Sequence, residues 1–282
     1  MKFGVATSGS SDPKLLQRLA SKADSLGYEV FLVTDHYMNS AGSGTLDAWT
    51  FLSYVAAKTQ NIKLGTCVTP IPFRRPPILA KMIATLDNLS NGRALLGAGA
   101  GWYRPEFEGF STWLETGKRV AMTRESITLM KNLWTEREPV NYEGKYVSSK
   151  GGWIEPKPAQ KPHPPIWFGT TSTQSLKTCG RLCDGWLPIG PRWYSTDYPR
   201  PERYASLRKI IVEELKKREI SEQRFVFSCL IDYSDPKNLT SDVESYVKAG
   251  MNFFTLGLSH QRDETALEKL EQVARDLVPS FS

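Results

Sequence analysis

The chain contains few of the residues that bind metals or form covalent cross-links. Only three histidines and four cysteines occur among its 282 residues, and no Cys-x-x-Cys pair is present. Zinc sites use clustered cysteine and histidine ligands, and structural disulfides are typical of secreted proteins. We therefore expect no metal site and interpret the cysteines as reduced, buried thiols of a cytoplasmic protein. They are Cys67, Cys179, Cys183 and Cys229.

Long apolar runs are also absent. No segment approaches the roughly 20 apolar residues that a membrane-spanning helix needs, so we expect no membrane association. The first residues, MKFGVATSG, lack the apolar region of a secretion signal and instead resemble a first β-strand. The motifs of serine hydrolases, zinc peptidases and P-loop proteins are missing as well. Hydrolase and nucleotide-triphosphatase functions therefore have no candidate residues.

Positive charge is in modest excess but is not concentrated. The 36 Lys and Arg residues outnumber the 30 Asp and Glu residues, which gives a formal net charge of +6. The basic residues are scattered and often lie beside acids, as in EELKKRE. Nucleic-acid-binding proteins instead concentrate basic residues on one face among aromatic ones, so we expect no nucleic-acid partner. Charge alone is equally compatible with an anionic small ligand.

Strand-like and helix-like segments alternate along the whole chain. Apolar runs without two-residue alternation are each followed by apolar residues at helical spacing, which predicts parallel strands covered on both faces. A chain of this length fits a (β/α)8 TIM barrel, although an open doubly wound sheet has a similar pattern. The strands are expected at residues 3–7, 29–34, 62–69, 94–97, 165–169, 185–189, 225–231 and 253–258.

One segment interrupts this alternation. Residues 139–161 contain many Gly, Pro and Lys residues and show no periodicity. We interpret the segment as an insertion or a hairpin on the barrel rim. No repeat or linker divides the chain, so we expect one domain over residues 1–282.

Polar residues follow the second predicted strand. In a TIM barrel the active site lies beyond the carboxyl ends of the strands, and Asp35 and His36 occupy that position here. A histidine beside a carboxylate can hold or move a proton near neutral pH. The same pair fits a structural hydrogen bond at the start of a loop equally well. Asp35 and His36 are therefore candidate catalytic residues.

Two glycine-containing segments follow other strands. Gly97–Gly101 lacks the G-x-G-x-x-G spacing, and it fits either a close approach of backbone to a flat ligand or a tight turn. Gly169–Ser172 precedes a helix, where free N–H groups can bind an anion, while Ser172 also fits an ordinary N-cap. Nearby aromatic residues fit a pocket wall or the core: Trp102, Tyr103, Trp186, Trp193 and Tyr194.

Three longer motifs resemble those of the bacterial-luciferase-like flavin and deazaflavin oxidoreductases. The segment PPILAKMIATLDNLSNGRALLGAGAGWYRPEF resembles the family pattern of an alanine-rich helix, L-D-x-L-S-x-G-R, a strand, G-x-G-x-G-W, and an acidic residue before phenylalanine. EPKPAQKPHPPIWFGTTS and CDGWLP are similar to two further family segments. The likeness covers most of residues 1–190 and fades after about residue 195.

This resemblance implies a TIM barrel that binds a flavin or a deazaflavin, often as a homodimer. Asp35-His36 and Gly65–Thr69 resemble the subgroup that uses coenzyme F420, whereas members that use FMN more often have Glu-His-His. The acidic tail of F420 also suits a net charge of +6. The implied function is hydride transfer between F420 and a small organic substrate. The alternatives are an FMN-dependent monooxygenase that works with a separate flavin reductase, and a non-catalytic flavin-binding protein.

The resemblance also implies roles for individual residues. His36 would lie near the reacting face of the cofactor as a proton donor or electrostatic partner, and Glu106 or Glu108 could supply an acid. A cis peptide is expected between Cys67 and Val68. Residues after the third strand would support the ring, those after the fourth would line its edge, and those after the fifth would hold the phosphate. The implied cofactor-binding residues are Asp35, Cys67, Val68, Thr69, Gly99, Ala100, Gly101, Gly169, Thr170 and Thr171.

Overall fold

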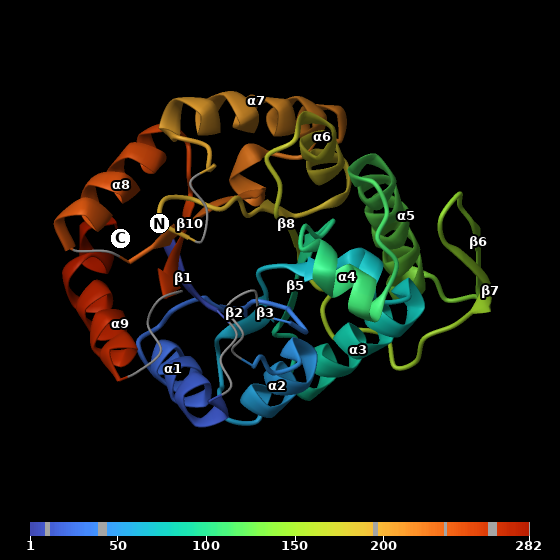
Figure 1. Cartoon of the computed structure of the whole chain (residues 1–282), viewed down its shortest axis with the longest axis horizontal. Helices are drawn as coiled ribbons and strands as arrows, with labels where there is room; N and C mark the ends of the chain where they lie inside the picture. Colours follow the sequence, from blue (N-terminus) through green and yellow to red (C-terminus); the bar gives the residue numbers. More distant parts are fainter. Residues whose placement is uncertain (9–11, 39–43, 194–196, 234–235, 259–263, 282) are drawn as a thin grey trace.

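Eight parallel strands form a closed barrel in the computed structural model, which describes residues 1–8, 12–38, 44–193, 197–233, 236–258 and 264–281 (Figure 1). The strands pair in sequence order, and pairing of the first with the last closes the ring. The predicted TIM barrel is confirmed, because closure excludes an open doubly wound sheet. The barrel strands are β1 (Lys2–Thr7), β2 (Val30–Val33), β3 (Lys63–Thr66), β5 (Ala94–Gly99), β8 (Ile166–Phe168), β9 (Gly185–Trp186), β10 (Val226–Asp232) and β11 (Phe253–Leu258).

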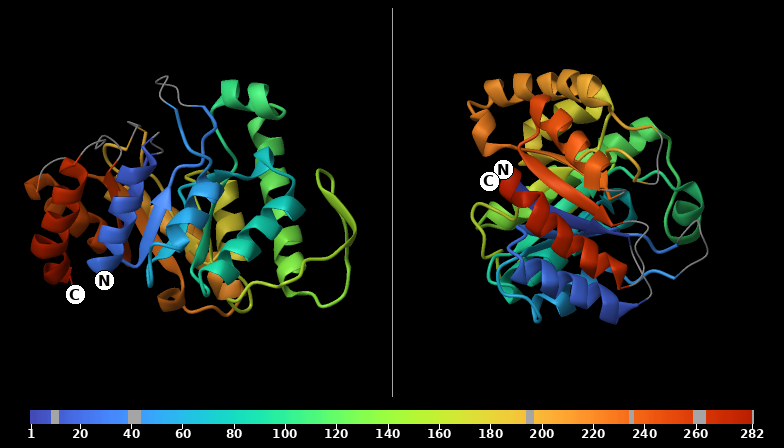
Figure 2. Two further views of the ribbon diagram at one scale, coloured as in Figure 1. Left: turned by 90° about the horizontal axis from the view of Figure 1, so that it is seen from below. Right: turned by 90° about the vertical axis from the view of Figure 1, so that its left-hand side faces the viewer.

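Helices surround the barrel, as the views in Figure 2 show. Local signals set several helix starts; for example, the Asp12 carboxylate accepts hydrogen bonds from the backbone N–H groups of Lys14 and Leu15, and Pro13 occupies the first helical position. The helices are α1 (Pro13–Ser25), α2 (Ala48–Ala56), α3 (Pro76–Leu89), α4 (Arg104–Phe110), α5 (Thr116–Thr135), α6 (Thr173–Leu182), α7 (Pro201–Lys217), α8 (Pro236–Lys248) and α9 (Thr265–Asp276). Short 3-10 helices span Ile71–Phe73, Glu222–Arg224 and Val278–Phe281.

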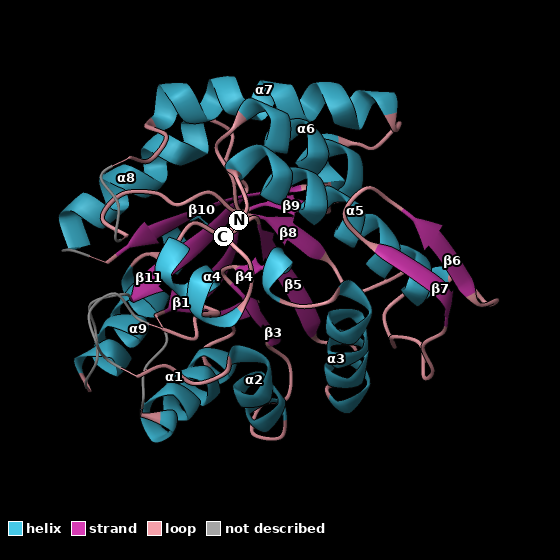
Figure 3. Ribbon diagram, turned by 45° about the vertical axis from the view of Figure 1, so that its right-hand side comes forward, coloured by secondary structure: helices cyan, strands magenta, loops and turns pink. Residues whose placement is uncertain are grey.

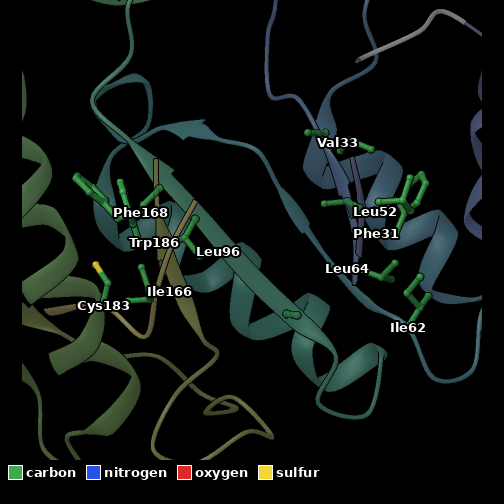
Figure 4. Packing of buried hydrophobic residues seen from close by; sticks show 14 of the residues in the cluster. Phe31, Val33, Leu52, Ile62, Leu64, Leu96, Ile166, Phe168, Cys183 and Trp186 are labelled. Atoms are coloured by element: carbon green, nitrogen blue, oxygen red, sulfur yellow. The ribbon is translucent and has the colours of Figure 1, made fainter. Parts of the chain in front are cut away.

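The strands are buried on both faces, as parallel strands in a barrel require. On β2, Phe31 and Val33 belong to the cluster between strands and helices, part of which Figure 4 shows. The alternate residues of β2, Val30 and Leu32, belong to a second cluster that fills the barrel interior. In that interior the rings of Trp167 and Phe253 pack edge to face, with centroids 5.0 Å apart. The core therefore consists of two layers separated by the sheet.

Two family motifs meet at the amino end of β5, opposite the expected site. The buried Asp87 carboxylate accepts hydrogen bonds from the backbone N–H and the side-chain amide of Gln160, at 2.8 and 2.6 Å. The Arg93 guanidinium donates to the carbonyl oxygens of Ala56 and Ile62. The L-D-x-L-S-x-G-R segment and the EPKPAQKPHPPIWFGTTS segment thus hold the loops together at the amino ends of the strands. Their role there is structural.

Residues 139–161 contain the predicted hairpin, whose strands β6 (Val140–Glu143) and β7 (Ser148–Gly152) pair antiparallel (Figure 3). The Glu125 carboxylate of α5 accepts a hydrogen bond of 2.7 Å from the backbone N–H of Tyr146. The hairpin therefore packs on the outer side of α5, at the edge of the molecule in Figure 1.

The helices in the described part of the chain lack the features of membrane spans. None of them combines the length and the apolar character that crossing a bilayer requires.

Candidate active site

A cavity of about 330 Å³ opens at the carboxyl ends of the barrel strands. The predicted site residues that line it follow four different strands, and they are His36, Cys67, Val68, Gly99, Ala100, Gly101, Gly169, Thr170 and Thr171. A larger and more open depression of about 500 Å³ lies near Arg208 and Asn252. Asn252 directly precedes β11, so that depression lies at the amino ends of the strands, where TIM-barrel active sites do not occur.

His36 pairs with Glu106, and both residues line this cavity. Its Nδ1 atom lies 2.9 Å from Glu106 Oε2, and the other carboxylate oxygen accepts hydrogen bonds from the backbone N–H groups of Tyr37 and Met38. Glu106 is only 1% exposed. Burial by itself would raise the pKa of Glu106, but the hydrogen bonds from His36 and the two N–H groups outweigh it and hold the pKa below its ordinary value. Glu106 is therefore an ionised acceptor, which leaves His36 Nε2 to exchange a proton.

The sequence left Glu106 and Glu108 as alternative candidates for the acid, because helix α4 was not predicted. Its segment RPEFEGF is too short to show helical periodicity, and only Pro105 at its start signals a helix. The structure separates the two acids: Glu108 forms an exposed ion pair of 2.7 Å with Arg104, while Glu106 turns into the site. The family pattern of an acid before phenylalanine, here Glu106-Phe107, was the available signal.

Asp35 and Thr69 are the two predicted site residues that do not line the cavity. The carboxylate of Asp35 is buried and accepts hydrogen bonds of 2.7 and 2.9 Å from Arg74 and one of 2.7 Å from Thr69 Oγ1. Sequence adjacency suggested that Asp35 and His36 act together. In the structure the two side chains contact different partners, Glu106 for His36 and Arg74 with Thr69 for Asp35. The contacts of Asp35 and Thr69 fit the structural role.

Cys67, Val68, Gly99 and Gly169 line one part of the cavity, which we call the cavity floor. The expected cis peptide between Cys67 and Val68 is present. The side chain of Val68 packs between two glycines: a Cβ atom added to Gly99 would lie 2.5 Å from Val68 Cγ2, and one added to Gly169 would lie 2.9 Å from Val68 Cγ1. Burial raises the pKa of the Cys67 thiol to about 12, so this thiol is neutral and unsuited to nucleophilic chemistry.

The start of α6 provides backbone N–H groups at the cavity wall. Thr170 and Thr171 line the cavity just before this helix. Ser172 is its N-cap and accepts a hydrogen bond from the backbone N–H of Ser175 at 3.4 Å, so the ordinary capping role is confirmed. The positive end of the helix dipole lies at the same place, which makes this wall suitable for a phosphate group.

Residues 1–275 match the luciferase-like monooxygenase family. The chain belongs to this family.

Individual relatives agree with this assignment. An uncharacterised protein of Mycobacterium tuberculosis is 39% identical over 170 residues, which are 60% of this chain and 56% of that protein. The match thus spans little more than half of that relative. The coenzyme F420-dependent tetrahydromethanopterin reductase of Methanopyrus kandleri superposes with a TM-score of 0.83 at 20% identity, covering 100% of this chain and 99% of that one. The oxygenating constituent of 3,6-diketocamphane monooxygenase of Pseudomonas putida, in complex with FMN, has a TM-score of 0.79 at 18% identity, covering 99% and 98%. At these identities both structures show a shared fold.

Aromatic side chains of this luciferase-like chain divide between the cavity and the core. Trp102, Tyr103 and Trp193 line the cavity. Trp186 is fully buried and stacks on Tyr204 with ring centroids 4.6 Å apart, so it belongs to the core. The remaining candidate, Tyr194, lies outside the described residues. Among the described residues no group of three His, Cys, Asp or Glu side chains could hold a metal ion.

Proposed function

We propose that this luciferase-like protein is an oxidoreductase that transfers a hydride between coenzyme F420 and a small organic substrate. One observation carries the proposal: His36, paired with the ionised Glu106, lines the same cavity as Cys67 and Gly99–Gly101. Hydride transfer to or from a carbon that bears oxygen also moves a proton, and a histidine suits that task near neutral pH.

The residues around the cavity fit a flat cofactor with a phosphate-bearing tail. Gly99 and Gly169 allow the Val68 side chain to pack between them, so the cavity floor carries no large side chain. Gly169–Thr171 and the start of α6 would hold the phosphate. The bound deazaflavin would supply the ring carbon that gives or takes the hydride.

The protein's own contribution is orientation and proton transfer. In the oxidation direction, the substrate O–H proton passes to His36 Nε2 while the neighbouring C–H bond breaks and its electron pair leaves with the hydrogen toward the cofactor. Glu106 stabilises the resulting positive charge on His36 through the 2.9 Å contact at Nδ1. In the reduction direction the protonated His36 returns its proton to the carbonyl oxygen. Asp35 has no part in this transfer and fixes the chain through Arg74.

An FMN-dependent monooxygenase that works with a separate flavin reductase is the second candidate. The charge of the cavity favours this candidate. Within the described part of the chain, no Lys or Arg lines the cavity to bind the acidic tail of F420. The excess positive charge of the sequence is therefore not gathered at these lining residues. The binding-only alternative loses support, because the described residues of the 139–161 segment lie outside α5 and do not line the cavity.

Equilibrium titrations with F420 and FMN, each oxidised and reduced, test the proposal. We expect oxidised F420 to bind more tightly than FMN, and single-turnover mixing of the loaded protein to show hydride transfer. Equal or reversed affinities would favour the monooxygenase. Binding of either cofactor without turnover on any substrate would favour the non-catalytic alternative.

A further inference from the structure

We propose that the substrate is an uncharged, single-ring aromatic alcohol or carbonyl compound whose ring packs on Trp102. This inference rests on the proposed function, because it assumes that His36 exchanges a proton with a substrate oxygen. Two independent features support it: the charge balance of the cavity and the position of Trp102.

The charges around the cavity are already matched. Glu106 and Asp197 are the acidic residues among the described lining. Glu106 accepts hydrogen bonds from His36 and two backbone N–H groups, and Asp197 forms an ion pair of 3.4 Å with Arg203. The Cys67 thiol is neutral because burial raises its pKa.

These pairings disfavour a charged substrate of either sign. The described lining offers an anionic substrate no Lys or Arg to replace the water it loses on entering. A cationic substrate would find Glu106 already bonded to three donors, and Asp197 is 88% exposed, so an ion pair with it would contribute little. Burying an unpaired charge is costly, whereas an alcohol or a carbonyl loses little if its oxygen bonds to His36.

Trp102 is an exposed apolar side chain at the cavity mouth. It is 68% exposed although it lines the cavity, and its ring meets the His36 ring edge to face, with centroids 6.1 Å apart and planes at 79°. The preceding Gly101 has a φ of +76°, and a Cβ atom there would lie 2.5 Å from the Phe107 ring. Only glycine fits this turn, so the turn that carries Trp102 to the mouth is built into the fold.

An aromatic substrate suits this wall better than an aliphatic one. A ring stacked on Trp102 would gain the specific aromatic contact as well as apolar burial, and its oxygen would remain within reach of the adjacent His36. The rest of the described wall is largely apolar and includes Phe107, Val120, Leu187 and Leu230. The cavity of about 330 Å³ must also hold the cofactor ring, so the remaining space suits a small substrate of one ring.

Trp153 provides a matched control for Trp102. Its side chain is 62% exposed, close to the value for Trp102, but it follows β7 on the outer hairpin and does not line the cavity. The experiment measures binding by calorimetry of benzyl alcohol, benzoate and benzylamine, which share one ring and differ in charge. The protein is loaded with whichever oxidised cofactor it binds more tightly, so the readout does not require turnover.

We expect benzyl alcohol to bind at least tenfold more tightly than benzoate or benzylamine. Trp102→Ala should weaken benzyl alcohol binding at least tenfold, Trp102→Phe should retain most of it, and Trp153→Ala should change it less than twofold. Val120→Lys places a cation in the lining and should raise the affinity for benzoate. Thermal unfolding of each variant verifies that it is folded.

Two results would overturn the inference. One is a charged probe that binds wild-type protein as tightly as benzyl alcohol, and the other is an equal effect of Trp102→Ala and Trp153→Ala. Failure of the proposed function looks different: the protein prefers FMN, while the selectivity for benzyl alcohol and its dependence on Trp102 persist. If the protein binds F420 tightly but does not show that selectivity, the proposed substrate class is wrong while the proposed function stands.

Discussion

Arg74 forms hydrogen bonds with both carboxylate oxygens of Asp35, at 2.7 and 2.9 Å, and a third bond of 3.1 Å joins it to Asp47. Asp35 lies two residues after β2, near the start of the connection to α2, and Asp47 is the N-cap of α2. One buried guanidinium therefore ties together the two ends of the connection that carries His36. The ring of Tyr37 also lies 4.9 Å from this guanidinium.

Loss of Arg74 should destabilise the fold and misplace His36. Arg74→Met leaves the buried Asp35 carboxylate without its cation, and breaking a buried ion pair in this way typically costs about 3–5 kcal/mol. Urea unfolding measures this change, and turnover should fall with it. Arg104→Ala removes an exposed ion pair on α4 and is the control, because such pairs contribute about 0–1 kcal/mol. A similar loss of stability in both variants would contradict the structural role of Arg74.

The barrel could be predicted from sequence because its strands are continuous apolar runs and its helices have clear periodicity and capping residues. Cavity residues such as Gly99 and Gly169 were found for a related reason: Gly99 ends β5 and Gly169 directly follows β8. Local pattern was less informative where a contact joins distant residues. His36 and Glu106 are 70 positions apart, and no spacing rule indicates that they meet.

Asp35 illustrates a second limit of local pattern, because residues that are adjacent in sequence can have different partners. Its adjacency to His36 suggested a shared function, but neighbouring residues leaving a strand need not face the same way. The positions of Thr69 and Arg74, which are 34 and 39 residues farther along the chain, explain where the Asp35 carboxylate lies. The charge of the cavity was also hidden from the sequence, because a net charge of +6 gives no information about its distribution.

His36→Ala should slow turnover far more than it weakens cofactor binding. A residue that transfers a proton typically contributes about a hundredfold or more to the rate. The residues of the cavity floor, Cys67, Val68, Gly99 and Gly169, are unchanged in this variant. The comparison requires the rate constant for single-turnover hydride transfer and the dissociation constant of the cofactor. An unchanged rate would leave His36 with a structural role.

Glu106 should make folding stability depend on pH. Its pKa in the folded protein lies below the ordinary value of 4.5, so the ionised form is favoured by folding. The resulting stabilisation is present above that value and is lost as the pH falls through the folded pKa. Glu106→Gln should therefore remove part of the acid sensitivity and also slow turnover, since His36 loses its anionic partner. Glu108→Gln on the same helix is the control, and equal acid sensitivity in the two variants would refute the assignment.

We predict that the protein forms a homodimer through helices of the second to fourth β/α units. Ile78 and Leu89 of α3 are 58% and 66% exposed, and Tyr54 of α2 is 48% exposed. Burying such side chains favours association by about 25 cal/mol per Å² of apolar area. Light scattering at micromolar concentration should give twice the monomer mass, and the double variant Ile78→Glu, Leu89→Glu should give the monomer mass. A monomeric wild-type protein would reject the prediction.

Gly99→Ala should disrupt the cavity floor, and a second substitution should restore it. The added methyl group would lie 2.5 Å from Val68 Cγ2, closer than van der Waals contact permits, and a β-branched side chain cannot move aside easily. Overpacking of this kind typically costs about 1–3 kcal/mol. Because Val68 belongs to the proposed cofactor support, affinity for the cofactor should fall together with stability.

The double variant Gly99→Ala, Val68→Ala separates this clash from other causes. Removing both γ-carbons leaves Val68 Cβ at 3.5 Å from the new methyl group, which is an ordinary contact. Stability and cofactor affinity should therefore recover relative to Gly99→Ala. Gly117→Ala is the control, because nothing lies within 4 Å of a Cβ atom there and a helical alanine is favourable. If the double variant bound the cofactor no better than Gly99→Ala, the packing of Val68 between two glycines would not be what shapes the site.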